Sequence, residues 1–432
     1  MMSELSLESQ PSTIRVVHAG VEYSSPALRD LSAALDASLG VPPGRVAFAM
    51  ADGPLYVAAL LWAHQRNVRI AILPGELGVA GLPHASELNC TQLVVTVPPD
   101  AARFQAHAVE PLNGPVAADE AHPVWLCTSG TTGKPKPVGY SWQRLLASVK
   151  VSDGLHEARW MSLYPLSRFA GCNTLLHAAC NGSTLIIPDS YSPQALSAAI
   201  QQYKPTHLSG TPTLWKALLM RLDRGEWTHS IQQVTAGGEC VDQATLNLLH
   251  FWFPHARVTH VYATTESGVC TVVSDGLAGF PSAWLHDPSR RVELSVREGV
   301  LWVRRQSGES SEPWTNSGDQ VERRGDRMYF LGRQTEILNV GGAKVAPAIV
   351  EQCISEVPGV LQVHVFGKPS SLAGTLVCAE VAAEASRDLD ALRVTIMQAC
   401  RATLPAYAVP RKIEFVEELA VSSSGKLIRG TL

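Results

Sequence analysis

The sequence lacks the features that would place a chain in a membrane or on a nucleic acid. Its longest apolar stretch, residues 46–63, is interrupted by Asp52-Gly53-Pro54, so it is too short to span a bilayer. Lys and Arg number 35 against 39 Asp and Glu, giving a net charge of −4 and no basic excess for a polyanion. We therefore expect no membrane partner and no nucleic-acid partner.

Signs of export, of disulfides and of zinc are also missing. The nine cysteines are odd in number and never spaced as Cys-x-x-Cys, which argues against a disulfide framework and a zinc site. The first eight residues are acidic where a signal peptide would be basic. These absences predict a cytoplasmic protein in a reducing compartment.

What the sequence does contain is an alternation of strand and helix patterns. At 432 residues the chain is too long for one ordinary core, so two or three domains are expected. Strands separated by single helices imply a parallel, buried sheet, and Asp52-Gly53-Pro54 can cap the second helix. The predicted helices are 27–39 and 55–66, and the predicted strands are 45–50, 69–74 and 92–97.

Other segments have different patterns. Residues 98–123 are rich in Pro and Ala and predict an irregular connection. Residues 284–305 alternate apolar and charged side chains, which predicts antiparallel strands in a small barrel or sheet. The last hundred residues, with helices at 347–356 and 389–403, are of the right length for a small domain.

The stretch from Val124 to Lys136 predicts a strand followed by an anion-binding loop. After the apolar start, nine residues carry two glycines, four hydroxyls and two lysines. Glycines allow backbone N–H groups to converge on a phosphate, and lysines add positive charge. The spacing differs from a Walker loop. The candidate phosphate contacts are Thr128, Ser129, Gly130, Thr131, Thr132, Gly133, Lys134 and Lys136.

This nine-residue string resembles the phosphate-binding signature of the adenylate-forming superfamily, which includes acyl- and aryl-CoA synthetases, peptide-synthetase adenylation domains and luciferases. Further motifs follow in family order up to Arg429. The resemblance implies an α/β fold with a large N-terminal domain, residues 1–332, of layered, mostly parallel sheets with helices plus a small β-barrel-like subdomain. It also implies a small mobile α+β C-terminal domain, residues 333–432.

The resemblance assigns nucleotide and metal contacts. Tyr262 would stack on adenine, Thr265 would bond the α-phosphate, and Glu266 would hold Mg²⁺. Two short motifs complete the site, although Gly-Asp alone would be a turn and two glycines alone are weak evidence. The further nucleotide candidates are Gly237, Gly238 and Glu239 beside adenine, Asp319 on the ribose hydroxyls, and Arg333 on ribose or phosphate.

The acid pocket is implied by two other segments. Arg168 stands where the family usually has His or an aromatic residue, and it either pairs with a polar substrate group or covers a helix C-terminus. Small residues at Ser209 and Gly210 either leave room for a ring or allow strands to pack closely. Ala263 replaces the usual Gly and would narrow the pocket. The candidate substrate residues are Arg168, Phe169, Ser209, Gly210, Val261, Ala263 and Gly268.

The C-terminal motifs are implied to complete catalysis. Lys426 would contact the carboxylate and the α-phosphate from a mobile loop, although a lone Gly-Lys near a C-terminus would be a solvated charge. Gly341-Gly342 would line a thiol tunnel once the small domain turns, or would form only a hairpin turn. Thr335 occupies the hinge position where Asp or Lys is usual.

The implied reaction is ATP-dependent activation of a carboxylic acid as acyl-AMP, with Mg²⁺, followed by thioester formation. The acceptor would be CoA or the phosphopantetheine of an acyl or peptidyl carrier protein, and Ala373 before Gly374 favours the carrier. An aryl acid of modest size is expected. The alternatives are an amide-forming ligase, an oxidative luciferase and a non-catalytic nucleotide-binding relative.

Overall fold

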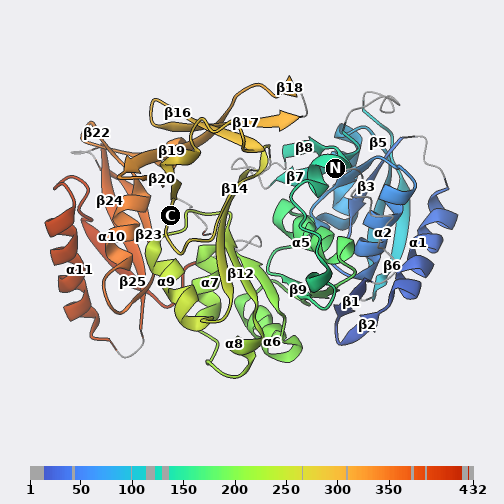
Figure 1. Cartoon of the computed structure of the whole chain (residues 1–432), viewed down its shortest axis with the longest axis horizontal. Coiled ribbons are helices and arrows are strands. Elements are labelled where there is room, and N and C mark those ends of the chain that lie inside the picture. Colours follow the sequence, from blue (N-terminus) through green and yellow to red (C-terminus); the bar gives the residue numbers. More distant parts are fainter. Residues whose placement is uncertain are drawn as a thin grey trace. The chain divides into compact units, whose positions relative to one another are not determined.

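A computed structural model describes residues 14–40, 44–98, 100–112, 122–128, 136–264, 266–307, 310–370, 374–384, 387–420 and 427. The contacts divide the chain into two compact units, residues 1–209 and 210–432. In Figure 1 the first unit runs from blue to green, and the second from yellow-green to red. Both units contain helices and sheets, as the predicted fold class requires.

A six-stranded sheet organises the first unit, in the order β6-β5-β3-β4-β7-β8. β3 pairs in parallel with β4 and β5, and β4 pairs in parallel with β7, so the predicted parallel sheet is confirmed. All five residues of β3 are buried. The strands are β3 (Arg45–Ala49), β4 (Ile70–Ile72), β5 (Cys90–Val97), β6 (Asp100–Ala108), β7 (Val124–Thr128) and β8 (Lys136–Tyr140).

Strand β6 corrects the prediction of an irregular connection over residues 98–123. It pairs antiparallel with β5 at the edge of the sheet. Arg103 and Gln105 are exposed, whereas Phe104 and Ala106 pack against the core. The period of two is present but is carried largely by alanines, so it was hidden in the composition.

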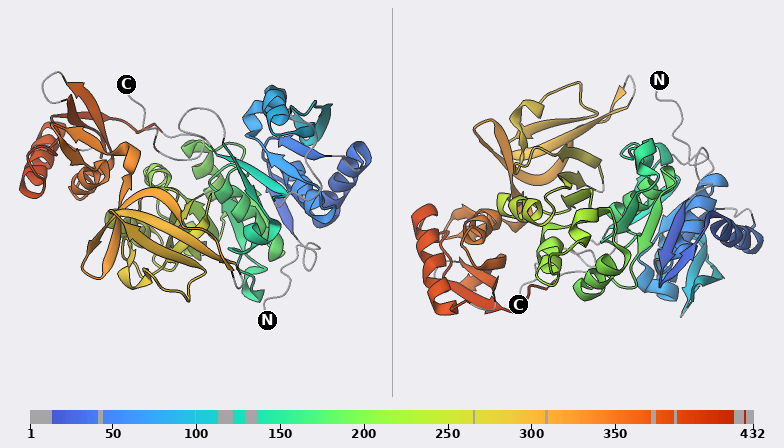
Figure 2. Two further views of the ribbon diagram at one scale, coloured as in Figure 1. Left: turned by 90° about the horizontal axis from the view of Figure 1, so that it is seen from above. Right: turned by 60° about the horizontal axis from the view of Figure 1, so that its bottom comes forward.

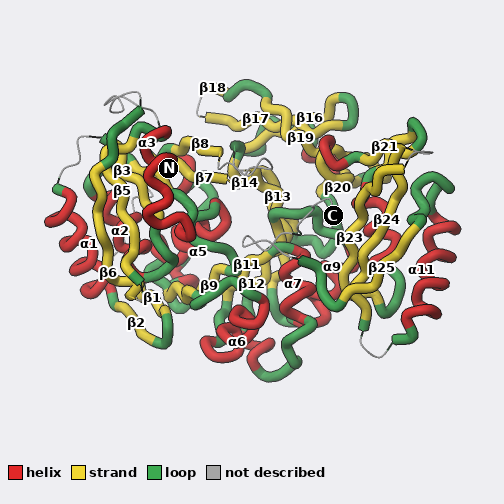
Figure 3. The backbone as a smooth tube through the Cα atoms, turned by 180° about the vertical axis from the view of Figure 1, so that it is seen from behind, coloured by secondary structure: helices red, strands yellow, loops and turns green. Residues whose placement is uncertain are grey.

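A second group of strands completes the first unit, in the order β11-β9-β10-β1-β2. Helix α2 supplies ten buried residues to the core, and α1 packs on α2 (Figure 3). The strands are β1 (Arg15–His18), β2 (Val21–Tyr23), β9 (Arg159–Ser162), β10 (Thr184–Ile187) and β11 (His207–Gly210). The helices are α1 (Ser25–Leu39), α2 (Pro54–Gln65), α3 (Leu82–Glu87), α4 (Trp142–Leu146), α5 (Phe169–Cys180) and α6 (Pro193–Tyr203).

The second unit begins with a small layered part. β12 (Gln233–Gly237) and β13 (Arg257–Thr264) are parallel, and β14 (Gly268–Val273) runs antiparallel to β13. The helices here are α7 (Pro212–Leu219), α8 (Trp227–Ser230) and α9 (Gln243–Trp252).

The predicted antiparallel strands of residues 284–305 belong to a larger sheet, coloured yellow to orange in Figure 2. Its order is β15-β20-β19-β17-β16, with β18 paired to β17. One apolar face of this sheet forms a core around Phe280, Leu294 and Leu301. The strands are β15 (Phe280–Pro281), β16 (Val292–Arg297), β17 (Val300–Ser307), β18 (Ser310–Ser311), β19 (Thr315–Arg324) and β20 (Arg327–Arg333).

The C-terminal part of this unit has a core of its own, drawn entirely from residues between Val340 and Ile413. Helices α10 and α11 pack against each other beside a three-stranded sheet in the order β23-β24-β25. The elements are β21 (Leu338–Val340), β22 (Ala343–Val345), α10 (Pro347–Ser355), β23 (Val360–Ser370), β24 (Gly374–Ala383), α11 (Leu389–Thr403) and β25 (Lys412–Val416). The domain boundary at 332/333 stays a prediction.

Among the described residues, no helix combines the length and the apolar character needed to cross a bilayer.

Candidate functional site

Three of the predicted nucleotide residues meet in the second unit. The antiparallel register of β19 and β20 places Asp319 opposite Arg333, and the Arg333 Nε lies 2.9 Å from the Asp319 Oδ1. The Tyr262 hydroxyl, from β13, donates to the Asp319 Oδ2 at 2.6 Å. Asp319 is only 8% exposed. The two donors therefore stabilise the negative charge of a largely buried carboxylate.

The electrostatics of this cluster keep Tyr262 as a neutral donor. Burial, followed by the charge of Asp319, raises the pKa of the Tyr262 phenol far above its usual range. The Tyr262 ring lies 4.6 Å from the ring of Phe330. Each carboxylate oxygen has two lone pairs, so Asp319 retains capacity to accept from ribose hydroxyls as well. The arrangement fits a nucleoside whose base stacks and whose sugar hydroxyls donate.

The backbone geometry requires glycine at two positions of the site. β12 ends at Gly237, which pairs in parallel with Val261 of β13. A Cβ on Gly237 would lie 2.9 Å from the Val261 carbonyl oxygen, too close for any side chain. Gly238 has a φ of 82°, in the left-handed region that glycine favours. The weak sequence signal of a glycine pair therefore marks a real close approach of two backbones.

Glu239 follows this glycine pair, and each of its carboxylate oxygens accepts a backbone N–H. The Oε1 accepts from Leu427 at 2.8 Å, and the Oε2 accepts from Thr213 at 3.1 Å. The predicted contact of Glu239 with adenine stays a prediction.

The structure describes only the two ends of the predicted phosphate loop, so the loop itself stays a prediction. β7 ends at Thr128 as expected, and it pairs antiparallel with β8, so that Thr128 lies opposite Lys136. The side chains of these two residues and the remaining loop candidates lie outside the described residues. The same is true of two catalytic candidates. The candidates outside the description are Ser129, Gly130, Thr131, Thr132, Gly133, Lys134, Thr265 and Lys426.

Glu266 is the candidate magnesium ligand, and it is described. Its exposed side chain lies between β13 and β14. No group of three His, Cys, Asp or Glu side chains suited to a metal occurs among the residues described by the structure. Mg²⁺ in nucleotide enzymes commonly takes one or two carboxylates and completes its shell with water and phosphate oxygens, so one exposed glutamate fits this metal.

The acid-pocket candidates of the first unit include an arginine that is already paired. Arg168 is the N-cap residue of α5. Its Nη1 donates to the Cys127 carbonyl at 3.4 Å, and its Nη2 lies 3.8 Å from the Glu76 carboxylate. The next residue, Phe169, stacks on Tyr140 with ring centroids 5.7 Å apart. Arg168 therefore contacts the strand that leads into the phosphate loop.

The remaining substrate candidates lie at strand ends. Ser209 and Gly210 end β11. In the β13–β14 pair the register shifts between Tyr262 and Ala263, which places Ala263 opposite Val269 and Thr264 opposite Gly268. A register shift of this kind redirects side chains locally.

Asp52 belongs to the segment that begins helix α2, but its carboxylate binds elsewhere in the first unit. As expected, Asp52-Gly53-Pro54 lies at the start of this helix, where Gly53 is the N-cap residue and Pro54 is the first helical residue. The Asp52 Oδ2 accepts from the Leu166 N–H at 2.8 Å and from the Tyr191 hydroxyl at 2.6 Å. Burial raises the pKa of the Asp52 carboxyl to about 6. An acidic residue three positions after a fully buried strand was the available signal.

Two family models match this chain. Residues 26–304 match the family described as AMP-binding enzyme, and residues 349–426 match its C-terminal domain. The chain belongs to the AMP-binding enzyme family. Its adenylate-forming character, predicted from the sequence, is thereby confirmed, and the likeness to solved structures confirms the predicted fold class.

Individual relatives agree with this placement. The chain is 26% identical over 444 residues to a feruloyl-CoA synthase of an Amycolatopsis species, covering 90% of this chain and 89% of the relative. It is 26% identical over 327 residues to a 2-succinylbenzoate–CoA ligase of Listeria monocytogenes, covering 71% and 68%. The crystal structure of an anthranilate CoA ligase with anthranoyl-AMP superposes with a TM-score of 0.77 at 17% identity, covering 98% and 94%.

Proposed function

We propose that the protein is an AMP-forming ligase that activates an aryl acid and transfers it to the thiol of CoA. The observation that carries the proposal is the Tyr262–Asp319–Arg333 cluster, which offers a stacking ring, a ribose acceptor and a positive charge within one unit. The proposal includes a catalytic domain of residues 1–332 and a mobile domain of residues 333–432.

The first half-reaction joins an acid to AMP. A carboxylate oxygen of the acid attacks the α-phosphorus of ATP, the bond from that phosphorus to the bridging oxygen breaks, and pyrophosphate leaves. Backbone and hydroxyl groups from Thr128 to Thr132, with Lys134 or Lys136, would hold the β- and γ-phosphates. Glu266 would bind Mg²⁺, whose positive charge would offset the negative charge of the phosphate oxygens. Lys426 would hold the carboxylate against the α-phosphate, with Thr265 beside it.

The second half-reaction forms the thioester. The thiol sulfur attacks the carbonyl carbon of the acyl-AMP, its proton goes to solvent, and AMP leaves. Neither step requires a covalent protein intermediate, so no nucleophilic side chain is assigned. The protein's contribution is orientation and charge placement, which is where enzymes of this kind obtain most of their rate.

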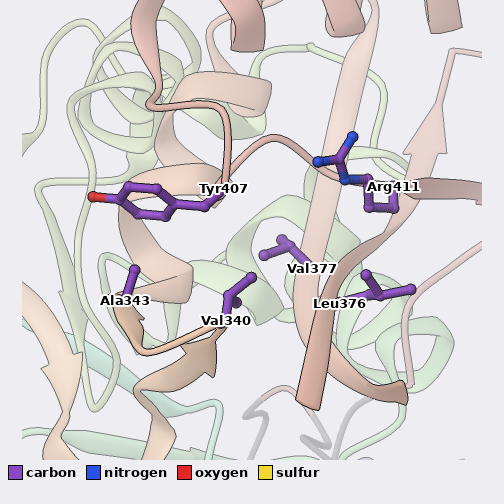
Figure 4. A pocket seen from close by; sticks show the side chains of 7 residues that line it. Val340, Ala343, Leu376, Val377, Tyr407 and Arg411 are labelled. Carbon is purple, nitrogen blue, oxygen red and sulfur yellow. The ribbon is translucent and has the colours of Figure 1, made fainter. Parts of the chain in front are cut away.

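CoA is the favoured acceptor, and part of it, a phosphate or its base, could enter a cavity beside the Gly341-Gly342 hairpin. The cavity has a volume of about 290 Å³ and is lined by Val340, Gly341, Leu376, Tyr407 and Arg411, among others. In Figure 4 Tyr407 lies on the side of the cavity with Ala343 and Val340, and Arg411 lies on the side with Leu376 and Val377. An aromatic ring can stack on a base, and a guanidinium pairs with phosphate.

The feruloyl, 2-succinylbenzoate and anthranilate ligases similar to this chain are also named for CoA. A carrier protein remains the second candidate, because Ala373 precedes Gly374 where some CoA-using relatives have an aromatic residue. Residue 373 lies outside the described residues.

The aryl preference rests on small residues and on Arg168. Ser209 and Gly210 leave room for a ring, and Arg168 could exchange its exposed partner Glu76 for a polar group of the substrate, because the 3.8 Å ion pair is loose.

The decisive experiment is acid-dependent exchange of pyrophosphate with ATP across a panel of benzoate, anthranilate, ferulate, 2-succinylbenzoate and palmitate. We expect exchange with one or more aryl acids, and a product thioester when CoA is added. Exchange with palmitate alone would contradict the aryl assignment. An amide formed from an added amine, or a product only with carrier protein, would contradict CoA as the acceptor. No exchange with any acid would favour a non-catalytic nucleotide-binding protein.

A further inference from the structure

Two of the nine cysteines lie against each other in the C-terminal part of the second unit. Cys353 is on helix α10 and Cys400 is on helix α11, and the two helices pack against each other (Figure 1). Their Sγ atoms are 4.0 Å apart, although the residues are separated by 47 positions in the sequence. Neither the spacing nor the odd number of cysteines indicates this pair, because it depends on how two distant helices pack.

Both thiols belong to the core of this part of the chain. Cys400 is fully buried, whereas Cys353 is 9% exposed. The Cys353 Sγ also lies 3.8 Å from the Thr403 hydroxyl oxygen. Burial, followed by the neighbouring Cys353, raises the pKa of the Cys400 thiol to about 12. Cys400 is therefore a neutral and weakly nucleophilic thiol while the two helices stay packed.

Packing alone is the competing explanation for this pair, because a free cysteine behaves as a small apolar residue in a core. The contact between the two sulfur atoms adds a chemical possibility. A disulfide bond is about 2.05 Å long, so the two sulfur atoms need to approach by about 2 Å from their separation of 4.0 Å. Rotation about the Cα–Cβ bonds moves the sulfur atoms without moving the helix backbones.

From this geometry we propose that Cys353 and Cys400 form a reversible oxidation site, at which a peroxide converts the two thiols into an intramolecular disulfide. The Cys353 thiolate attacks one oxygen of hydrogen peroxide and becomes a sulfenic acid, and the hydroxide that leaves takes up the thiol proton as water. The Cys400 sulfur then attacks the Cys353 sulfur, and the hydroxyl group leaves with the Cys400 proton as a second water. Two thiols thereby lose two electrons and two protons, and a dithiol reductant reverses the change.

Cys353 is the thiol that reacts first, because it is closer to solvent. It lies in the last turn of α10, a helix of only nine residues, and helix ends open at a lower free-energy cost than the core does. Cys400 lies deeper and reaches the oxidised Cys353 from inside the same core. This order assigns Cys353 as the reactive thiol and Cys400 as the resolving thiol.

The disulfide would stabilise the C-terminal part of the chain. It would close a loop between residues 47 positions apart, which contains β23 and β24, and a closed loop lowers the conformational entropy of the unfolded chain. Both cysteines belong to one core, whose residues all lie between Val340 and Ile413. The bond therefore joins nothing outside this part, and the inference does not depend on the proposed ligase activity.

The first test is a map of cysteine connections in the full-length wild type. The folded protein is treated with excess hydrogen peroxide, its remaining thiols are trapped with N-ethylmaleimide, and it is digested without reduction for mass spectrometry. We expect Cys353 and Cys400 in one pair of linked peptides, which dithiothreitol separates. Recovery of both as trapped thiols, linkage of either to another cysteine, or Cys353 recovered as a sulfinic acid would overturn the inference.

Hydrogen exchange gives a second test that requires no substrate. We expect oxidation of the wild type to slow amide exchange in peptides from α11 by at least about ten-fold, because opening of the cross-linked part becomes less favourable. Dithiothreitol should restore the original rate. No slowing in protein shown to contain the linked peptides would overturn the proposed stabilisation.

Matched serine variants show which thiols cause the effect, and each variant is compared with and without peroxide. Cys353→Ser cannot form the bond, so its exchange rates should not respond to peroxide. Cys378 is a buried cysteine on β24 of the same part, and Cys378→Ser should respond as the wild type does. Slowing in Cys353→Ser as large as in the wild type, or its loss in Cys378→Ser alone, would assign the effect to other thiols.

Discussion

Asp52 shows what a single buried charge does to this molecule. Its carboxyl has a pKa raised to about 6 because burial outweighs the hydrogen bonds from Tyr191 and Leu166. The bond to Asp52 fixes the Leu166 N–H. The Tyr56 hydroxyl donates to the Leu166 carbonyl at 3.1 Å. The turn that carries Arg168 is thus fixed by side chains from elsewhere in the first unit. No local sequence pattern predicts this hydrogen-bond network, because its residues are far apart in the chain.

The raised pKa predicts a pH dependence of stability. Since the folded value lies above the unfolded value of about 3.9, ionisation of Asp52 costs stability, and this cost grows as the pH rises from about 4 through 6. The wild type should therefore lose about 1 kcal/mol more than Asp52→Asn between pH 5 and pH 7. Urea unfolding at the two pH values measures this. Equal losses in the two proteins would show that Asp52 is ionised with an ordinary pKa.

Lys426 is the residue whose loss should damage catalysis most selectively. We expect Lys426→Ala to lower adenylation by about 10² to 10³, the usual cost of one preorganised charge contact, while ATP binding is largely retained. Exchange kinetics and equilibrium binding of ATP check the two halves of this prediction. Unchanged turnover would remove Lys426 from the site.

At the scale of elements, the site depends on how closely strands approach. The sequence predicted the strand β7 correctly, because it is an apolar run that ends in a glycine- and hydroxyl-rich turn. It did not predict β6, whose alternation is carried by alanines. It also placed Asp319 in a turn when taken alone, whereas the structure places it within β19, beside Gly318 with a φ of 73°.

The close pair of β12 and β13 gives a prediction at this scale. Gly237→Ala would push a methyl group to 2.9 Å from the Val261 carbonyl, so the strands must move apart. We expect a loss of about 1–3 kcal/mol in the free energy of unfolding, as for other overpacked sites, together with a rise in KM for ATP. Gly154→Ala, whose added Cβ would meet only one atom at 4.0 Å, is the control. If both variants unfold alike, the close approach is not a constraint.

At the scale of the whole molecule, the family and fold class could be read from the order of the motifs. The division into compact units at residues 209/210 could not, because it follows from contacts between distant segments. The hairpin β21–β22 shows the same limit: its glycines, with φ of 58° and 87°, form the turn that the sequence left as an alternative. Their proposed place beside the thiol is a separate question that the turn geometry does not answer.

The separate core between Val340 and Ile413 predicts how the chain can be cut. A fragment of residues 333–432 should fold alone and unfold cooperatively, because its apolar residues are buried against one another. The complementary fragment, residues 1–332, should bind ATP without forming acyl-AMP, because it lacks Lys426. Circular dichroism with urea titration and isothermal titration calorimetry measure these outcomes. A C-terminal fragment without a cooperative transition would place the boundary elsewhere.

The hydrogen bond from Tyr262 to Asp319 has a consequence for how the protein would read its nucleotide. The same phenol whose ring would stack on the base is anchored by the carboxylate that would receive the sugar, so a change at either end is transmitted to the other. Sugar-modified and base-modified analogues should therefore be penalised jointly, with non-additive losses in affinity. The base and the sugar of adenosine would therefore be recognised together, and not by two independent sets of contacts.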